Sequence, residues 1–143
     1  MAILNYTTTI DTTKTISEIQ KILAQHKAKA ILTEFNNQGE IIALSFKIDT
    51  SRGELGIKLP ANVEAVYQIL EIQKRKNSKI KATKEQATMV AWRIIKDWVE
   101  AQMAILETQM VEMEEIFLPY MINNNGQTLY ESFKNNQLMI GGN

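Results

Sequence analysis

The sequence predicts an α+β protein, in which an antiparallel sheet in the N-terminal half precedes a long amphipathic helix and a short C-terminal helix. The sheet is indicated by β-branched runs on both sides of Asn36-Asn37-Gln38-Gly39, because these turn residues tolerate positive φ angles and favour a hairpin. The long helix is indicated by apolar residues at intervals of three or four positions from residue 83 to residue 117. Together these patterns predict the order β-α-β-β-β-α, followed by helices.

The first half begins with a predicted strand and a predicted helix. Residues 4–10 alternate in polarity and are rich in β-branched side chains, which is typical of a strand. Thr15 and Glu18 form a capping box, a pair of side chains that satisfies free backbone amides where a helix begins. We therefore expect a helix that begins at this box and ends near Lys27.

Three further strands and a second helix complete this half. The strands are predicted at residues 30–35, 40–48 and 54–59, with a second turn at residues 49–53. Asn62 is a favourable N-cap for the helix that follows. The resulting α-β-β-β-α order resembles double-stranded RNA-binding domains, but Glu64 stands where those domains present cations, so the likeness is one of topology only.

Capping residues and turn residues also divide the second half. A polar connector at residues 74–82 precedes Thr83 and Gln86, which form a second capping box, and Pro119 ends the long helix. Residues 123–126 form a turn, and Thr128 with Glu131 predicts a short helix. We expect one domain over residues 1–143, with a sheet-containing half (1–73), the connector, a helical half (83–134) and a flexible tail (135–143).

The long helix carries two apolar stripes, and a helix with two stripes lies between two surfaces. The first stripe consists of Trp92, Ile95, Val99, Met103, Leu106, Met110, Met113 and Phe117. The second consists of Ala87, Ala91, Ile94, Trp98, Ala101 and Ile105. Such a helix would be on the order of 50 Å long, which exceeds the width of a small domain. Either it breaks near residues 108–111, or helix 83–117 packs against another copy in a homo-oligomer, and we expect the homo-oligomer.

Composition limits the classes of function. Sixteen Lys and Arg residues balance sixteen Asp and Glu residues, so any anion binding must be local. The absence of cysteine excludes disulfides, thiolate nucleophiles and sulfur-ligated zinc. No run reaches the ~20 apolar residues of a membrane span, and the N-terminus lacks the pattern of a signal peptide. We therefore expect a cytoplasmic protein that makes no membrane contact.

The segment from Trp92 to Trp98 holds the densest cluster of chemically useful side chains. A phosphate could bind Arg93 or Lys96, a base or other ring could stack on Trp92, and Tyr120 could close the rim of such a pocket. The alternative is structural, because Lys96 and Glu100, like Arg93 and Asp97, have the spacing of helical ion pairs.

The connector is the most biased segment, with five cations and no acid in residues 74–81. These cations could neutralise the phosphates of a nucleic acid or another anion. No aromatic side chain is interleaved with them, so base stacking is not indicated. The candidate residues are Lys74, Arg75, Lys76, Lys79 and Lys81.

Evidence for catalysis is weak. His26, the only histidine, lies at the margin of an apolar helix face, where a structural role is typical. Glu107, Glu112 and Glu115 cluster near the possible helix break and could support a metal-assisted enzyme, but a solvated face explains them equally. No phosphate-cradling glycine loop, nucleophile elbow or zinc-protease motif is present. We therefore expect no catalytic residues, no cofactor and no bound metal.

Three segments of the C-terminal half resemble a known family. The N-terminal half also fits this family, so the resemblance covers nearly the whole chain. Trp92-Arg93-Ile94-Ile95-Lys96-Asp97-Trp98, Leu118-Pro119-Tyr120 and Thr128-Leu129-Tyr130-Glu131 are similar to segments of a family of small proteins encoded by tailed phages and prophages. This resemblance implies a phage origin, and hence the host cytoplasm, rather than any particular activity.

Two functions follow as hypotheses. The first is a non-enzymatic phage accessory protein that binds and sequesters a host component, with a nucleotide-like defence signal as a candidate ligand. The second is a nucleic-acid-binding module that acts through the basic segment 74–81.

Overall fold

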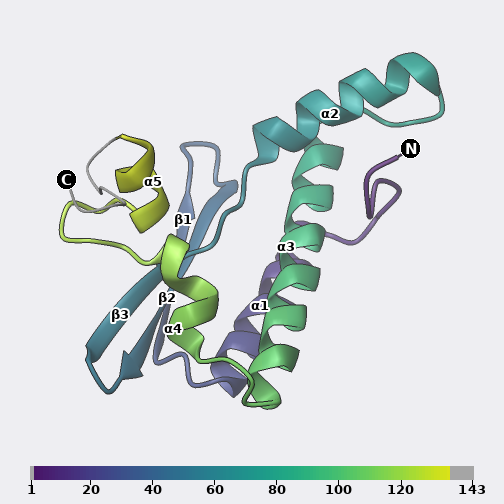
Figure 1. The fold of residues 1–143 in the computed structure, drawn as a ribbon. Helices are drawn as coiled ribbons and strands as arrows, with labels where there is room; N and C mark the ends of the chain where they lie inside the picture. The colour runs from purple at the N-terminus through teal and green to yellow at the C-terminus, as the bar shows by residue number, and fades with distance from the viewer. Residues whose placement is uncertain (1, 136–143) are drawn as a thin grey trace. The chain divides into compact units, whose positions relative to one another are not determined.

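The computed structural model describes residues 2–135 and confirms an α+β fold (Figure 1). The elements in chain order are α1 (Thr12–Gln25), β1 (Ala30–Phe35), β2 (Ile41–Thr50), β3 (Gly53–Lys58), α2 (Val63–Lys76), α3 (Lys84–Glu107), α4 (Met113–Phe117), the 3-10 helix η1 (Leu118–Tyr120) and α5 (Leu129–Lys134). The chain divides into two compact units: unit 1 contains Met1–Ile22 and Ala61–Met103, and unit 2 contains Leu23–Pro60 and Ala104–Asn143. These units do not coincide with the predicted halves 1–73 and 83–134, and most of the predicted tail lies outside the described residues.

Unit 2 is built on the predicted antiparallel sheet, with strand order β1-β2-β3. Its first hairpin is confirmed, because Asn36 Oδ1 accepts hydrogen bonds from the backbone amides of Gln38 and Glu40 at 2.9 Å. Gly39 supplies the positive φ, at 78°, that this turn requires. Near the turn the register shifts between Glu34 and Phe35, which leaves Ile42 as the extra residue of a β-bulge.

One face of the sheet, the buried face, carries the core of unit 2. Leu44, Phe46 and Ile48 of β2 lie there, and all three are buried. Phe117 of α4 packs edge to face on Phe46, with ring centroids 5.5 Å apart and an interplanar angle of 85°. This contact places α4 on the buried face (Figure 1).

The segment after η1 extends the sheet beyond β3. Met121 forms an antiparallel bridge with Ile57, and the Ile122 amide donates to the Gly56 carbonyl at 2.9 Å. The predicted capping box then begins α5, because Thr128 Oγ1 accepts from the Glu131 amide at 3.1 Å and a Glu131 carboxylate oxygen accepts from the Thr128 amide at 3.0 Å.

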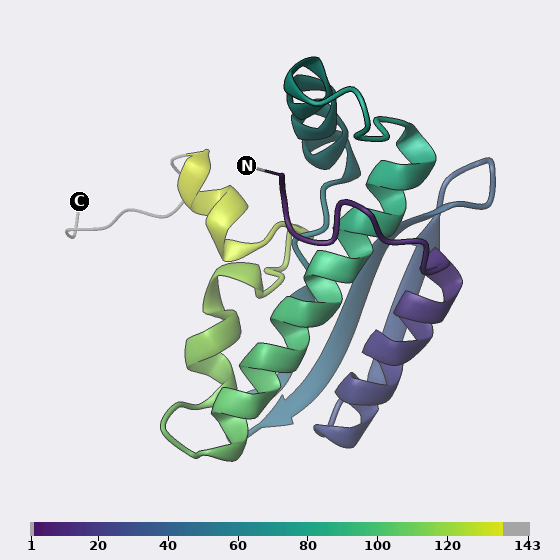
Figure 2. The ribbon, with the colours of Figure 1, turned by 90° about the vertical axis from the view of Figure 1, so that its right-hand side faces the viewer.

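Unit 1 is helical, and α2 crosses near the amino end of α3 (Figure 2). The two helices share a buried cluster of Leu70, Ile80 and Ala87, against which the N-terminal segment packs Ile3 and Tyr6. Asn62 caps α2 as predicted, since its Oδ1 accepts from the Ala65 amide at 3.1 Å.

The strand predicted at residues 4–10 is wrong. Residues 4–7 form a turn, with Asn5 at a φ of 64°, and the Thr8 amide donates to the Asn5 carbonyl. Two helix side chains bind the backbone here instead of a neighbouring strand. Gln73 Oε1 accepts from the Ile3 amide, and Gln86 Nε2 donates at 2.9 Å to the carbonyls of Tyr6 and Thr8.

The capping box predicted at Thr15 and Glu18 is also wrong, because α1 begins three residues earlier, at Thr12. Asp11 lies before the helix, and its Oδ1 accepts from the Thr13 amide at 3.3 Å. Thr15 is therefore inside the helix, and Glu18 forms an ion pair with Arg93 of α3.

The predicted long helix is interrupted near residues 108–111, which is the alternative that the sequence left open. The first part, α3, has 24 residues and is about 36 Å long. It ends at Glu107, and Gln109 then adopts a left-handed φ of 64° before α4 begins at Met113. The length that suggested a homo-oligomer is thereby reduced, and the homo-oligomer stays a prediction.

Candidate functional site

The four residues predicted as a ligand pocket do not share one compact unit. Trp92, Arg93 and Lys96 belong to unit 1, whereas Tyr120 belongs to unit 2. Trp92 is 0% exposed, so its ring is a core side chain. Its indole N–H is buried and has no hydrogen-bond partner among residues 2–135, which is unusual for tryptophan.

Acidic groups of unit 1 neutralise the two cations of that cluster. Arg93 Nη1 lies 2.5 Å from Glu18 Oε2 and also donates to Thr15 Oγ1 at 3.3 Å. Lys96 Nζ lies 2.8 Å from Glu100 Oε2, which confirms one predicted pair. The predicted pair of Arg93 with Asp97 is wrong, because Arg93 binds Glu18 and Asp97 Oδ2 accepts from Asn5 Nδ2 at 2.9 Å. Only 14% and 15% of the Arg93 and Lys96 side chains, respectively, is exposed. This arrangement favours a structural role for both side chains.

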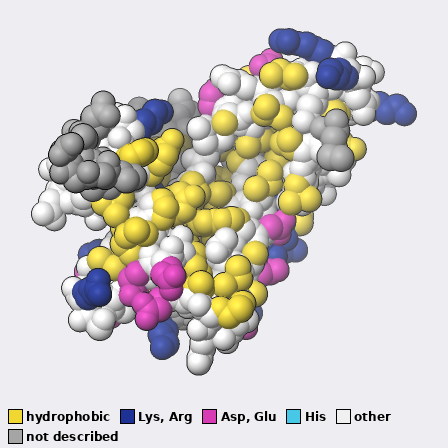
Figure 3. Space-filling model, viewed as in Figure 1, with side chains coloured by type: hydrophobic (Ala, Val, Ile, Leu, Met, Phe, Trp, Pro, Cys, Tyr) yellow, Lys and Arg dark blue, Asp and Glu magenta, His cyan; other side chains and the backbone are white. Residues whose placement is uncertain are grey.

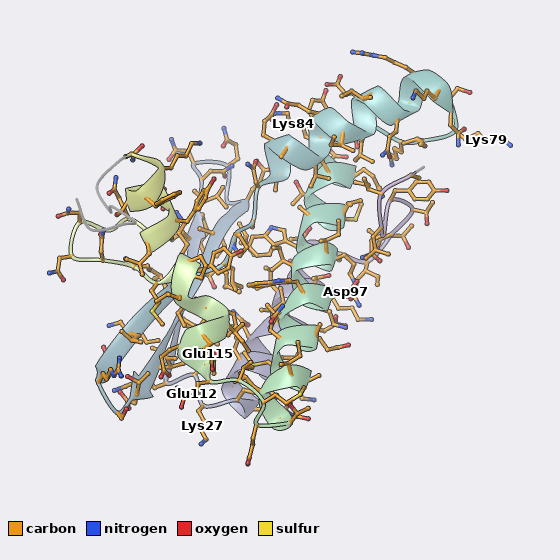
Figure 4. The ribbon with its side chains drawn as sticks, viewed as in Figure 1. Lys27, Lys79, Lys84, Asp97, Glu112 and Glu115 are labelled. Atoms are coloured by element: carbon orange, nitrogen blue, oxygen red, sulfur yellow. The ribbon has the colours of Figure 1, made fainter. Side chains whose placement is uncertain are left out.

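The basic segment has a different environment. We call the side chains of Lys74, Arg75, Lys76, Lys79 and Lys81 the basic tip, and all five are exposed. The first three lie in the last turn of α2, where cations are favourable, and so the predicted connector is partly helical. Figure 4 shows Lys79 pointing away from the protein beyond the end of α2, and Figure 3 shows dark-blue side chains gathered there.

The backbone that carries the basic tip is ordered. The Asn77 amide donates to the Gln73 carbonyl, and Asn77 Oδ1 accepts from the Lys79 amide at 3.1 Å. The Ile80 amide donates to the Asn77 carbonyl, and the Ile80 side chain is buried in the cluster that joins α2 to α3. A buried residue between Lys79 and Lys81 therefore fixes the loop and directs its cations outward.

No cation of the basic tip forms an ion pair with a described residue, whereas several cations elsewhere do. Lys84, only a few residues further along the chain, lies 2.7 Å from Glu64. The hydrogen bond to Glu64 and the charge of that carboxylate raise the pKa of Lys84 above its usual value. The basic tip is thus a local concentration of cations that form no ion pair with a described residue, on a protein of zero formal net charge.

The acidic residues predicted for a metal-assisted enzyme have structural partners. Glu107 Oε1 lies 2.9 Å from His26 Nε2. Glu115 Oε1 accepts from the Glu112 amide at 3.1 Å, where α4 begins (Figure 4). Within residues 2–135, no group of three or more histidine and acidic side chains is placed to hold a metal ion.

The structure also contains a hollow that the sequence did not indicate. It lies in unit 2 on the face of the sheet opposite to the buried face, and it has a volume of about 560 Å³. Ala30, Ser45, Lys47, Gly56 and Lys58 are among its lining residues. The small residues that form it are visible in the sequence, but only the strand register shows that they are neighbours on one face of the sheet.

Comparison with known proteins gave no assignment: no family model, no curated protein and no solved structure matches the chain. No helix among the described residues has both the length and the apolar character needed to cross a membrane.

Proposed function

We propose that this protein binds nucleic acid through the phosphate backbone, using the five cations of the basic tip. The observation that carries the proposal is that these exposed cations, carried on an ordered backbone, form no ion pair with any residue in the described part of the chain. Cations of this kind attract phosphates because binding releases the counterions condensed along a nucleic acid.

The surroundings of the basic tip favour recognition of phosphates rather than of bases. Residues 74–81 contain no aromatic side chain. The nearby Tyr67 ring is already engaged, since Lys84 Nζ lies 5.1 Å from its centroid. Without a stacking platform, affinity should depend on charge and vary little with nucleotide sequence.

The test is a salt titration of DNA binding with a charge-matched control. The triple variant Lys74→Gln, Arg75→Gln, Lys76→Gln removes three tip cations and retains good helix formers. Fluorescence anisotropy with a labelled DNA duplex should show weaker binding, and the slope of log K against log salt should flatten by up to about 2.7. An RNA duplex and a single strand, titrated in parallel, show which nucleic acid binds most tightly.

The control variant removes the same charge elsewhere, at Lys14, Lys21 and Arg52, which are exposed and form no ion pair with a described residue. With these three residues changed to glutamine, the salt slope should remain close to that of the parent protein. Equal losses in the two triple variants would mean that binding depends on total charge, and the basic tip would then not be the site. Circular dichroism verifies that each variant is folded.

Sequestration of a host component remains the other hypothesis, together with a phage origin, a cytoplasmic location and a homo-oligomer. The buried ring of Trp92 and the ion-paired Arg93 give it less support than the basic tip gives nucleic-acid binding. Native mass spectrometry of protein purified gently from cells that carry the phage would test it directly. A retained mass of nucleotide size would favour sequestration, whereas a bare protein that gains mass only with oligonucleotides would favour the proposal above.

A further inference from the structure

The hollow in unit 2 arises because small residues lie next to one another on the face of the sheet opposite to the buried face. The register aligns Ala30 with Lys47 and Lys47 with Gly56, so that a row across the three strands contains two very small residues. The neighbouring row aligns Leu32, Ser45 and Lys58. Small residues form the floor, and longer side chains at either end form the walls.

Gly56 leaves the space into which the segment after η1 packs. A Cβ atom built at Gly56 would lie 3.6 Å from Ile122 Cδ1, which is an ordinary van der Waals contact. Ile122 and Gly126 line the hollow from that side, and Leu32 and Ala30 line it from β1. The walls are therefore largely apolar, as in most small-molecule sites, and the volume of about 560 Å³ is typical of such sites.

Ser45 is the central polar group of this hollow. The residue is only 8% exposed, and its hydroxyl forms no hydrogen bond with any residue from 2 to 135. Among the described residues, Trp92 holds the one fully buried side-chain nitrogen or oxygen that lacks a partner, so the Ser45 Oγ atom is accessible from the hollow that it lines. A donor and acceptor without a partner, lining a hollow of this size, is what a polar group of a ligand could use.

The charges around Ser45 favour an anion. Lys58 lies directly opposite Ser45 in the register, is half-buried, and forms no ion pair with a described residue, although its charge helps to lower the pKa of Glu131. Lys47 lies 3.3 Å from Glu54, but Glu54 is also held by Lys29 at 2.9 Å, so one carboxylate is shared between two cations. Among the described residues that line the hollow, Glu34 is the only acidic one, against two lysines.

We propose that this hollow binds a small carboxylate with an apolar body, the carboxylate lying against Lys58 and Ser45 and the body against Leu32, Gly56 and Ile122. The lysine would provide the charge, the serine hydroxyl would donate to a carboxylate oxygen, and the apolar walls would exclude water from the body. The site lies wholly in unit 2 and shares no residue with the basic tip, so it is independent of the proposed function.

Amide NMR titration with four probes tests the proposal. Octanoate and benzoate have a carboxylate on an aliphatic and an aromatic body, acetate has no apolar body, and octylamine has the octanoate chain with the opposite charge. Octanoate or benzoate should shift the amides of Gly56 and Gly126 in a saturable manner, and comparison of the two distinguishes the class of body. Acetate and octylamine should shift them little. Shifts with octylamine equal to those with octanoate would overturn the proposal.

Variants distinguish the site from general attraction of anions. Lys58→Met should weaken octanoate binding at least tenfold, whereas Arg52→Met, at an exposed position in the second hairpin turn, should leave it unchanged. Gly56→Ala adds a methyl group on the hollow side at a position that tolerates one, and it should also weaken binding. If Lys58→Met does not fold, Gly56→Ala and Ser45→Ala provide the same comparison. Unchanged binding in folded variants of Gly56 and Ser45 would refute the site.

Discussion

Replacing Gln86 with methionine should release the N-terminal segment of unit 1. Gln86 is 4% exposed, and its Nε2 donates at 2.9 Å to the carbonyls of both Tyr6 and Thr8. Methionine has nearly the same shape and volume but cannot donate, so the substitution removes hydrogen bonds without creating a large cavity.

The expected loss follows from the two carbonyls that are left without a donor. An unsatisfied buried polar group costs about 1–3 kcal/mol, and these carbonyls are partly buried, so we expect the free energy of unfolding to fall by about 2–4 kcal/mol. Urea titration followed by circular dichroism measures this loss. Hydrogen exchange should accelerate at the Ile3 and Thr8 amides, because the segment that contains them would detach more often.

Two further variants make the result specific to the hydrogen bonds. Gln102 lies on the same helix and forms no side-chain bond with a described residue, so Gln102→Met should change stability by less than about 0.5 kcal/mol. In Gln86→Glu, a protonated carboxyl can donate one bond but a carboxylate cannot, so the destabilisation should grow as pH rises through the carboxyl pKa. A Gln86→Met loss no larger than that of Gln102→Met, with unchanged exchange at Ile3, would refute the reasoning.

Three further predictions concern packing, capping and ion pairing. Phe117→Ala should lower the free energy of unfolding by about 3–5 kcal/mol in urea titration, and a loss below about 1 kcal/mol would contradict its place in the core. The hydrogen bond from the Thr128 amide is the main reason why the pKa of Glu131 is lowered, so the stability that this bond adds is present above the unfolded pKa and is lost as pH falls through the folded pKa. Glu131→Gln should therefore reduce the loss of stability at acid pH in denaturation curves. A double-mutant cycle of Arg93→Met and Glu18→Gln should give a coupling of about 1 kcal/mol, and additivity would show that the pair contributes nothing.

Local signals predicted those elements whose causes lie within a few residues. The hairpin at Asn36 and Gly39 and the capping box of Thr128 and Glu131 depend on hydrogen bonds between near neighbours, and both are confirmed. The strand predicted at residues 4–10 failed for the opposite reason. The side chains that bind the backbone of this segment, including Gln86, lie at least 70 residues away along the chain, so no local pattern could indicate them.

The same distinction applies to the candidate sites. The basic tip is contiguous, so composition located its cations, and the structure adds that Ile80 fixes their backbone. The capping box of Thr15 and Glu18 was a real pattern, but the distant Arg93 binds Glu18. The hollow depends on register, since nothing in the sequence shows that Ser45 and Lys58 are neighbours.

The division of the chain has a consequence for its folding during synthesis. Unit 1 combines residues 1–22 with residues 61–103, so it is incomplete until the ribosome has released more than two thirds of the polypeptide. Unit 2 needs residues beyond 103 and is completed last. The hairpins of β1, β2 and β3 can form earlier, but the buried face of their sheet must wait for Phe117. A nascent chain stalled between residues 60 and 103 would therefore expose that apolar face, and would be the form most in need of a chaperone.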